Sequence, residues 1–135
     1  MSIHCTFCEI ARKEKPASCV YEDDRTMAFL DVRPINDGHT LVIPKKHYDN
    51  IYKIPDEEVA HLFRVVKKVA TAVKKGMNAE GIRIFQNNGR AASQVVFHIH
   101  VHILPRYEGQ NSHQPRSNVC TERLDDVARR IKQFI

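Results

Sequence analysis

The sequence lacks the two features that would place the chain in a membrane or on a secretory route. No apolar run approaches the roughly 20 residues that a membrane-spanning helix needs. The first residues, MSIHCTFCEI, have neither the basic start nor the long apolar stretch of a secretory signal. We therefore expect a cytoplasmic protein with no membrane partner.

A concentrated block of positive charge is also missing, although the net charge is +5. The lysine pairs at 45–46, 67–68 and 74–75 are scattered, and no recognised nucleic-acid-binding motif stands out. The charge permits an anionic ligand such as a nucleotide. We do not expect a nucleic acid partner.

Internal repeats, low-complexity tracts and linkers are absent as well. The length of 135 residues suits one domain with one core, and a hydrophobic fraction of 42% is ordinary for a globular protein. We expect a single domain over residues 1–135.

The four cysteines do not suggest a disulfide framework, because nothing indicates secretion. Cys19 and Cys120 are expected to be reduced thiols in packed or semi-buried positions. Cys5 and Cys8 form a C-x-x-C pair, whose two sulfurs can reach one metal ion. A redox pair and two unligated thiols are the alternatives.

Short apolar runs bounded by turn residues predict five strands. They lie at 19–23, 26–32, 39–44, 82–86 and 95–104. Residues 105–118 are expected to form a loop, which leads into a helix that completes the segment 105–135. Adjacent short strands with two substantial helices predict an antiparallel α+β domain.

The longest predicted helix begins at Asp56, which can cap it, and ends near Gly76. Its apolar positions are Val59, Leu62, Phe63, Val66, Val69, Ala70 and Val73. Periodicity leaves open whether Val66, Val69 and Val73 face the core or a partner chain. Two further helices are predicted, one over 6–15 and a terminal amphipathic one that carries Leu124, Val127, Ala128, Ile131, Phe134 and Ile135.

Three histidines alternate in the stretch FHIHVHILPR, at His98, His100 and His102. Side chains two residues apart share one face of a strand, so the three imidazoles would stand in a row. The opposite face would carry Phe97, Ile99, Val101 and Ile103. The row predicts either a metal site or a nucleophile with a neighbouring hydrogen-bond donor, as phosphorus chemistry requires. A buried ladder of polar side chains is the third interpretation. The residues alone do not decide between a metal site and a nucleophile.

Five longer stretches carry a resemblance that decides between these readings. They are CTFCEIARKEKPA (5–17), VYEDDRTMAFLDVRP (20–34), GHTLVIPKKHY (38–48), FQNNG (85–89) and HIHVHIL (98–104). In order and spacing they resemble the histidine triad (HIT) family of nucleotide hydrolases and transferases, of the type with a zinc-binding C-x-x-C. The resemblance implies a HIT-like fold: an antiparallel sheet of about five strands, a long central helix and a C-terminal helix.

The same resemblance implies a mechanism in which His100 is the nucleophile. It would attack the α-phosphorus of a nucleotide and form a nucleotidyl-histidine intermediate, which water then hydrolyses. His102 would hydrogen-bond the phosphate or the bridging atom. His39 would support the cluster from a neighbouring strand, its alternative being an exposed histidine at a strand edge.

A nucleotide pocket follows from the resemblance in the same way. Asp31 matches the acid that accepts hydrogen bonds from the ribose hydroxyls, although an Asp there is otherwise a turn former. Asn87 and Gln94 match amide donors near the phosphates, with a turn as the alternative for Asn87. The apolar positions around the base are matched by Phe7, Ile10, Phe29 and Val32, which are otherwise ordinary core residues.

The resemblance also implies a structural zinc ion that the chemical step does not require. Its ligands would be Cys5, Cys8, His47 and His98, two sulfurs and two nitrogens that form a good tetrahedral set. The row of histidines would then divide between zinc, nucleophile and phosphate contact.

Three details bear on the substrate. Val95 stands where the phosphoramidase branch tends to have a hydroxyl residue, and HILPR resembles the branch that cleaves dinucleoside polyphosphates. The compact N-terminal half, however, resembles the phosphoramidase branch more closely. The leading expectation is hydrolysis of a purine nucleoside phosphoramidate or related adenylyl substrate. Hydrolysis of diadenosine polyphosphates is the alternative enzyme, and a non-catalytic nucleotide-binding scaffold is the alternative class. A homodimer is expected.

Overall fold

The computed structural model describes residues 4–110 and 118–135. In chain order its elements are α1 (Thr6–Ala11), β1 (Cys19–Glu22), β2 (Thr26–Leu30), β3 (Thr40–Pro44), α2 (Asp56–Gly76), β4 (Gly81–Phe85), the 3₁₀ turn η1 (Arg90–Ala92), β5 (Val101–Arg106) and α3 (Thr121–Lys132). Four of the five strands and the long helix lie within two residues of their predicted bounds. Half of the expected loop over 105–118, residues 111–117, falls outside the described residues, and its first two residues belong to β5.

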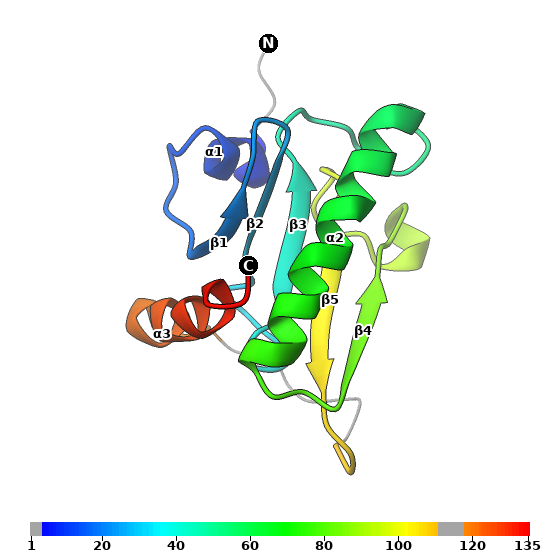
Figure 1. Cartoon of the computed structure of the whole chain (residues 1–135). Coiled ribbons are helices and arrows are strands. Elements are labelled where there is room, and N and C mark those ends of the chain that lie inside the picture. Colours follow the sequence, from blue (N-terminus) through cyan, green and yellow to red (C-terminus); the bar gives the residue numbers. More distant parts are fainter. Residues whose placement is uncertain (1–3, 111–117) are drawn as a thin grey trace.

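The five strands form one sheet in the order β1-β2-β3-β5-β4, and every neighbouring pair is antiparallel. The central helix α2 lies along one face of this sheet, and α3 packs beside it (Figure 1). The fold is therefore of the predicted antiparallel α+β class.

The sheet separates a large apolar cluster from a small one. The large cluster lies between the sheet and the two long helices, and it contains Val66, Val69 and Val73 of α2. This finding answers the question that periodicity left open, because the three valines face the core. The small cluster lies on the other side of the sheet, where Phe7 and Ile10 of α1 cover it.

Alternation along β3 and β5 determines which side chains reach the small cluster. On β3, Val42 belongs to the large cluster while Leu41 and Ile43 belong to the small one. On β5, Val101 faces the large cluster and His102 pairs in register with Leu41. Successive residues of a strand point to opposite faces, so His102 stands on the same side as α1.

The triad segment differs from the prediction in one respect. The predicted strand over 95–104 begins only at Val101, so His102 is the one triad histidine within β5. The backbone N–H of Ile99 donates to the carbonyl of Tyr48 at 2.7 Å, a residue before α2, instead of to a neighbouring strand. Phe97, expected on the buried face, is 37% exposed, whereas Ile99 is fully buried as predicted.

Three other expectations about helices are wrong. The short helix ends at Ala11, because Lys13 adopts a left-handed backbone conformation with φ of 61°. Asp56 is the first residue of α2 and not its cap, which is Pro55 without a side-chain hydrogen bond. The predicted terminal helix included Phe134 and Ile135, but both follow the end of α3 and are exposed; Phe63 of α2, although part of the apolar spacing, is exposed as well.

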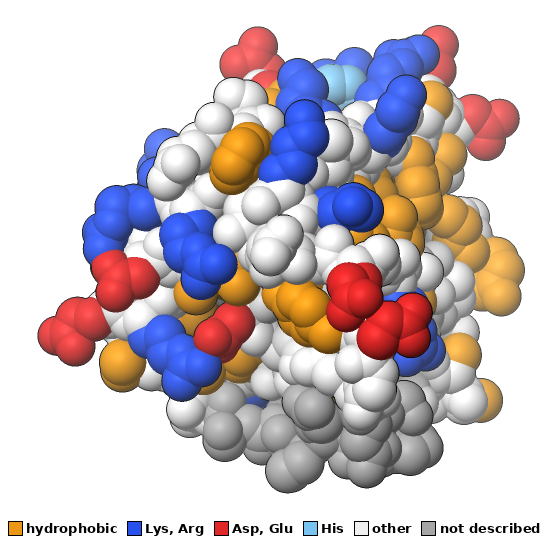
Figure 2. Space-filling view, turned by 60° about the horizontal axis from the view of Figure 1, so that its bottom comes forward, with side chains coloured by type: hydrophobic (Ala, Val, Ile, Leu, Met, Phe, Trp, Pro, Cys, Tyr) orange, Lys and Arg blue, Asp and Glu red, His pale blue; other side chains and the backbone are white. Residues whose placement is uncertain are grey.

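The described helices and the face drawn in Figure 2 bear on membrane and nucleic-acid binding. Among the described helices, none combines the length and the apolar character needed to cross a bilayer. On the face that Figure 2 shows, basic side chains are interspersed with acidic, apolar and neutral surface.

Candidate active site and metal site

His98, His100 and His102 are all buried, and so is His39 on the strand side of the same cluster. The rings of His100 and His102 have their centroids 4.9 Å apart, and those of His39 and His102 lie 5.2 Å apart. Phe7 of α1 meets the His100 ring edge-on at 5.1 Å. The fold thus brings together three of the four histidines at the predicted reaction centre, with His98 directed elsewhere.

The hydrogen bond of His100 fixes its tautomer. Its Nδ1 lies 2.8 Å from the backbone carbonyl of His98, so this nitrogen carries the proton and donates it. The lone pair is therefore on Nε2. Burial also lowers the pKa of His100 below its ordinary value, which keeps the ring neutral at pH 7.

A chain of hydrogen bonds fixes the tautomers of the other two rings. The backbone N–H of Ile35 donates to Nδ1 of His39 at 3.1 Å, so the proton of a neutral His39 is on Nε2. That Nε2 lies 2.9 Å from Nδ1 of His102 and donates to it. A neutral His102 then has its own proton on Nε2, where it is a donor.

Phe85 of β4 is a site residue that the sequence did not reveal. Its ring stacks on that of His102 at a centroid distance of 4.2 Å and an angle of 6°, and the guanidinium of Arg83 lies over the Phe85 ring at 4.7 Å. The β4–β5 register places Phe85 directly opposite His102. No pattern within β4 specifies that register, so sequence reasoning had no signal for this contact.

The residues matched to a ribose and base site are only partly assembled. The carboxylate of Asp31 accepts the backbone N–H of Arg33 at 2.9 Å and lies 3.8 Å from His39 Nε2. Phe7 and Phe29 meet edge-on at 5.5 Å in the small cluster. Ile10 is buried in the same cluster, whereas Val32 is 55% exposed to solvent.

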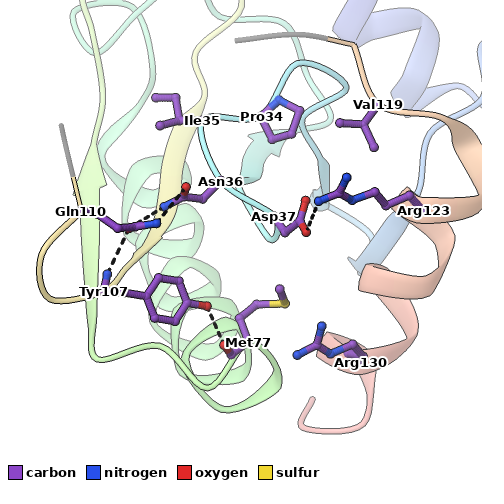
Figure 3. Close-up of a pocket in the computed structure, with 10 residues that line it drawn as sticks. All are labelled: Pro34, Ile35, Asn36, Asp37, Met77, Tyr107, Gln110, Val119, Arg123 and Arg130. Atoms are coloured by element: carbon purple, nitrogen blue, oxygen red, sulfur yellow. Dashed lines mark hydrogen bonds and ion pairs between the residues drawn. The ribbon is translucent and has the colours of Figure 1, made fainter. Parts of the chain in front are cut away.

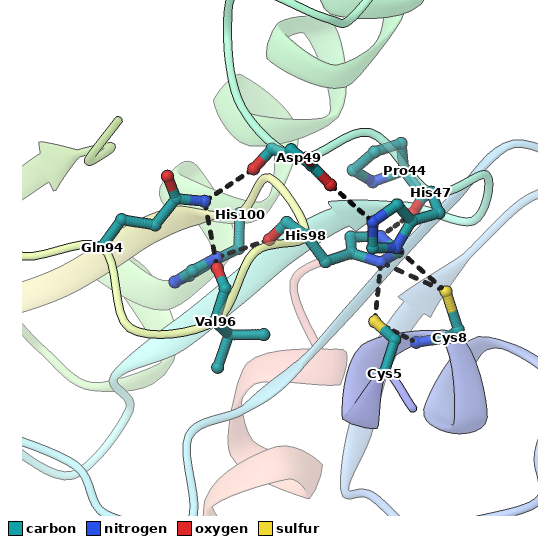
Figure 4. A network of polar contacts seen from close by, with 9 residues as sticks. All are labelled: Cys5, Cys8, Pro44, His47, Asp49, Gln94, Val96, His98 and His100. Carbon is teal, nitrogen blue, oxygen red and sulfur yellow. Dashed lines mark hydrogen bonds and ion pairs between the residues drawn. The ribbon is translucent and has the colours of Figure 1, made fainter. Parts of the chain in front are cut away.

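The two amides matched to phosphate donors have different surroundings. Gln94 is buried, and its Nε2 donates to the carbonyls of Asp49 at 2.6 Å and Val96 at 3.1 Å (Figure 4). Its Oε1 accepts the backbone N–H of Gly89 at 2.7 Å, so this amide ties three stretches of loop together. Asn87 is less buried, and its Nδ2 makes one long contact of 3.5 Å.

The four predicted zinc ligands converge on one point. The ligand atoms of Cys5, Cys8, His47 and His98 all lie within 4.8 Å of one another. The Sγ atoms of both cysteines lie 3.4 to 3.5 Å from Nδ1 of His98, and Sγ of Cys8 lies 3.4 Å from Nδ1 of His47 (Figure 4). The segment before α2, the triad segment and α1 thus meet at a Cys₂His₂ cluster that can hold a metal ion.

Hydrogen bonds outside the cluster orient both imidazoles for a metal. Nε2 of His98 donates to the carbonyl of Pro44 at 2.8 Å, and Nε2 of His47 lies 2.8 Å from a carboxylate oxygen of Asp49. Each Nδ1 therefore presents its lone pair to the sulfurs, as in metal sites with a polar outer shell. Burial lowers the pKa of His98 to about 4 and raises the pKa of Cys8 to about 11.

A second group of possible ligands, Asp31, His39 and His102, also lies within 4.8 Å. Here the facing nitrogens of the two rings are only 2.9 Å apart. That separation is a hydrogen-bond distance, and His39 Nε2 carries the proton of that bond because its Nδ1 accepts the Ile35 N–H, so Nε2 offers no lone pair to an ion. We interpret this group as a proton-holding cluster.

The model of the HIT domain family matches residues 12–109, which is most of the chain. The chain belongs to the HIT family. An uncharacterised HIT-like protein of Methanocaldococcus jannaschii is 46% identical over 128 residues, covering 95% of this chain and 98% of its own.

Two relatives of the HIT protein have names that state an activity. The adenosine 5′-monophosphoramidase of Candida albicans is 41% identical, over 76% of this chain and 70% of its own length. The adenylylsulfatase of Arabidopsis thaliana is 41% identical over 77% of this chain, which spans only 53% of that longer protein.

Solved structures of HIT proteins support the fold. A hypothetical histidine triad nucleotide-binding protein of Sulfolobus tokodaii has a TM-score of 0.90 at 41% identity, covering 96% of this chain and 90% of that one. A zinc-bound histidine triad family protein of Mycobacterium smegmatis has a TM-score of 0.86 at 38% identity, covering 96% and 91%.

Proposed function

We propose that this HIT protein is a nucleotidyl hydrolase in which His100 is the nucleophile. The observation that carries the proposal is the 2.8 Å bond from His100 Nδ1 to the carbonyl of His98, which leaves the lone pair on Nε2. Nε2 attacks the α-phosphorus of a purine nucleotide, an N–P bond forms, and the bond to the leaving group breaks. Water then attacks the same phosphorus, and the N–P bond breaks to release the nucleoside monophosphate and the neutral imidazole.

His102 and His39 serve this displacement together. The Nε2–H of His102 donates to a phosphoryl oxygen or to the bridging atom, where negative charge grows as the leaving group departs. His39 holds His102 in the donor tautomer through their 2.9 Å contact. The network needs no reorganisation during the reaction, because every link from the Ile35 backbone to His102 is already in place.

The proposed nucleotide pocket lies beside these histidines. Asp31 binds the ribose hydroxyls, and its position 3.8 Å from His39 supports that role. Asn87 and Gln94 shape the phosphate side, with Gln94 holding the Gly89 backbone through its Oε1. In this proposal the base packs against the apolar side chains of Phe7, Ile10, Phe29 and Val32.

We propose that Zn²⁺ occupies the Cys5, Cys8, His47 and His98 cluster. The convergence of four suitable atoms within 4.8 Å and the zinc-bound relative from Mycobacterium smegmatis support this. When bound, the ion supplies structural cross-linking of α1 to the triad segment and no step of the reaction. The residues themselves hold His98 away from the reaction centre, which leaves His100 and His102 for the phosphate.

A homodimer remains part of the proposal. Among the described residues, β4 pairs on one side only, with β5, and its Ile84 side chain is half exposed. An unpaired strand edge is a ready surface for a second copy. Sedimentation velocity at micromolar concentration tests this directly, and a monomer over the whole concentration range contradicts it.

The substrate is tested by comparing three adenylyl compounds under one set of conditions. The relatives' names favour an adenosine phosphoramidate and adenylyl sulfate, while a diadenosine polyphosphate tests the alternative enzyme. At the position where the phosphoramidase branch tends to have a hydroxyl residue, this chain has Val95, which is 86% exposed. If the diadenosine compound is turned over faster, diadenosine polyphosphates and not phosphoramidates are the substrate class. Tight AMP binding without turnover of any compound would indicate a scaffold.

A further inference from the structure

A cavity of about 490 Å³ lies apart from the histidines, and we name it the α3 cavity. It opens between the loop that precedes β3, the segment after β5, the end of α2 and the side of α3 (Figure 3). Both long helices cover the face of the sheet opposite the triad. Its volume falls within the range of small-molecule sites.

Two arginines on α3 give this cavity its charge. Arg123 forms an ion pair with Asp37 at 2.7 Å, on the opposite wall. Within residues 4–110 and 118–135, the guanidinium of Arg130 has no hydrogen bond or ion pair, and Figure 3 shows it directed into the cavity toward Met77. With two arginines and one aspartate among the lining residues, the wall has an excess of one positive charge.

The other polar groups of the wall are already occupied. The hydroxyl of Tyr107 donates to the carbonyl of Met77 at 2.6 Å, and Asn36 donates to Gln110 Oε1 at 3.0 Å. These bonds engage the polar groups of Tyr107 and Asn36 and leave Arg130 as the group that offers several N–H donors to an incoming molecule. A planar guanidinium matches a phosphate or carboxylate with two parallel hydrogen bonds.

We propose that the α3 cavity is a binding site for a small oxyanion ligand, one that carries a phosphate or carboxylate group. Arg130 binds the anionic group directly, and Arg123 adds a second contact as it shares its charge between the ligand and Asp37. The ligand's remaining atoms lie along the wall formed by Met77 and Tyr107. This site is separate from the proposed nucleotide pocket and does not depend on it.

The position of the cavity links its occupancy to the histidine chain. Its wall includes Ile35, whose N–H donates to His39 Nδ1 at 3.1 Å, and Asn36, whose carbonyl accepts the His39 backbone N–H at 3.0 Å. Gly38, directly before His39, packs so closely that an added Cβ would lie 2.6 Å from Met77 Cγ. A ligand that moves Asp37 or Met77 therefore moves the segment that holds His39. The catalytic consequence of this movement rests on the proposed function.

The test is an NMR titration of the full chain with inorganic phosphate, against potassium chloride at equal ionic strength. No nucleotide is added, because its own phosphate would compete for the cavity; the His100 and His102 ring signals report phosphate in the nucleotide pocket separately. We expect saturable shifts of the Arg130 and Arg123 Nε–Hε signals and of the Ile35 and His39 backbone amides. A parallel titration with succinate separates a phosphate site from a carboxylate site, and saturation by either supports the proposal.

The matched variants are Arg130→Gln and Arg129→Gln. Arg129 is on the same helix and pairs with Asp126 outside the cavity. The dissociation constant should rise at least about tenfold in Arg130→Gln, because charge-assisted hydrogen bonds are lost, and should not change in Arg129→Gln. Equal binding by Arg130→Gln, or only linear shifts that chloride reproduces, overturns the proposal. Both results are read without turnover, so they are independent of whether His100 is the nucleophile.

Discussion

Nε2 of His39 lies 2.9 Å from Nδ1 of His102, and the other nitrogen of His39 accepts a hydrogen bond from the backbone. The backbone N–H of Ile35 thereby determines, through the His39 ring, which nitrogen of His102 carries the proton. Because the loop conformation fixes these bonds, the proton of a neutral His102 is on Nε2, which donates at the proposed phosphate site.

Replacing His39 by asparagine removes this control. We expect the turnover number to fall on the order of tenfold to a hundredfold, since a buried hydrogen bond worth roughly 1–3 kcal/mol is lost, while KM changes little. Steady-state kinetics measure this, with thermal melting to confirm folding. His4→Asn is the control, because His4 is exposed and pairs only with Glu9 among the described residues. An unchanged turnover number in folded His39→Asn would show that His102 needs no such support.

Phe85 is expected to act as a positioning residue for His102. In Phe85→Leu the ring that stacks at 4.2 Å is lost, and we expect the turnover number to fall roughly 2- to 10-fold, as the worth of an aromatic pair suggests. Phe85→Tyr keeps the stack and should restore the rate. If both variants lose only thermal stability and keep their turnover number, the stack has a purely structural role.

The zinc proposal predicts a stability change on metal removal. A chelator should lower the melting temperature by roughly 10 °C or more, because a structural zinc site contributes several kcal/mol to folding. Cys8→Ser should reproduce the loss, whereas Cys120→Ser, at an exposed thiol outside the cluster, should not. A melting temperature that is the same with and without chelator, in protein shown to contain zinc, would contradict the structural role.

The pH dependence follows from the lowered pKa of His100. Protonation removes the Nε2 lone pair, so activity is lost as the pH falls through the pKa of the folded protein. Because burial places that pKa below the ordinary 6.5, activity should persist at pH 6.5 and decline only in more acidic solution. The measurement is kcat/KM against pH with a phosphoramidate monoanion that does not titrate in this range. An acidic limb centred above pH 6.5 would contradict the assignment.

The sequence predicted the fold where periodicity is strong. The apolar spacing of α2 located that helix correctly, and four strands followed from their short apolar runs. It failed for the triad segment, where alternation was read as a strand from residue 95. The alternation of sides persists at Ile99 and His100, but the backbone there bonds to Tyr48 and not to a strand. Tertiary contacts decided the hydrogen bonding, which a local pattern does not contain.

Sequence motifs predicted those parts of the site whose residues belong to the motifs themselves. The convergence of Cys5, Cys8, His47 and His98 came from the family resemblance, since 93 positions separate Cys5 from its hydrogen-bond partner His98. The Phe85 stack depends on the register between β4 and β5, and the occupied amide of Gln94 depends on how three loops meet. Neither relationship can be predicted from the order of the residues alone.

The most direct measurement is intact-protein mass spectrometry after rapid acid-free quenching with an adenosine phosphoramidate. Wild-type protein should show a transient adenylyl adduct, and His100→Ala should show neither the adduct nor AMP release. A folded His100→Ala protein that still forms the adduct or releases AMP at the wild-type rate would contradict the central assignment.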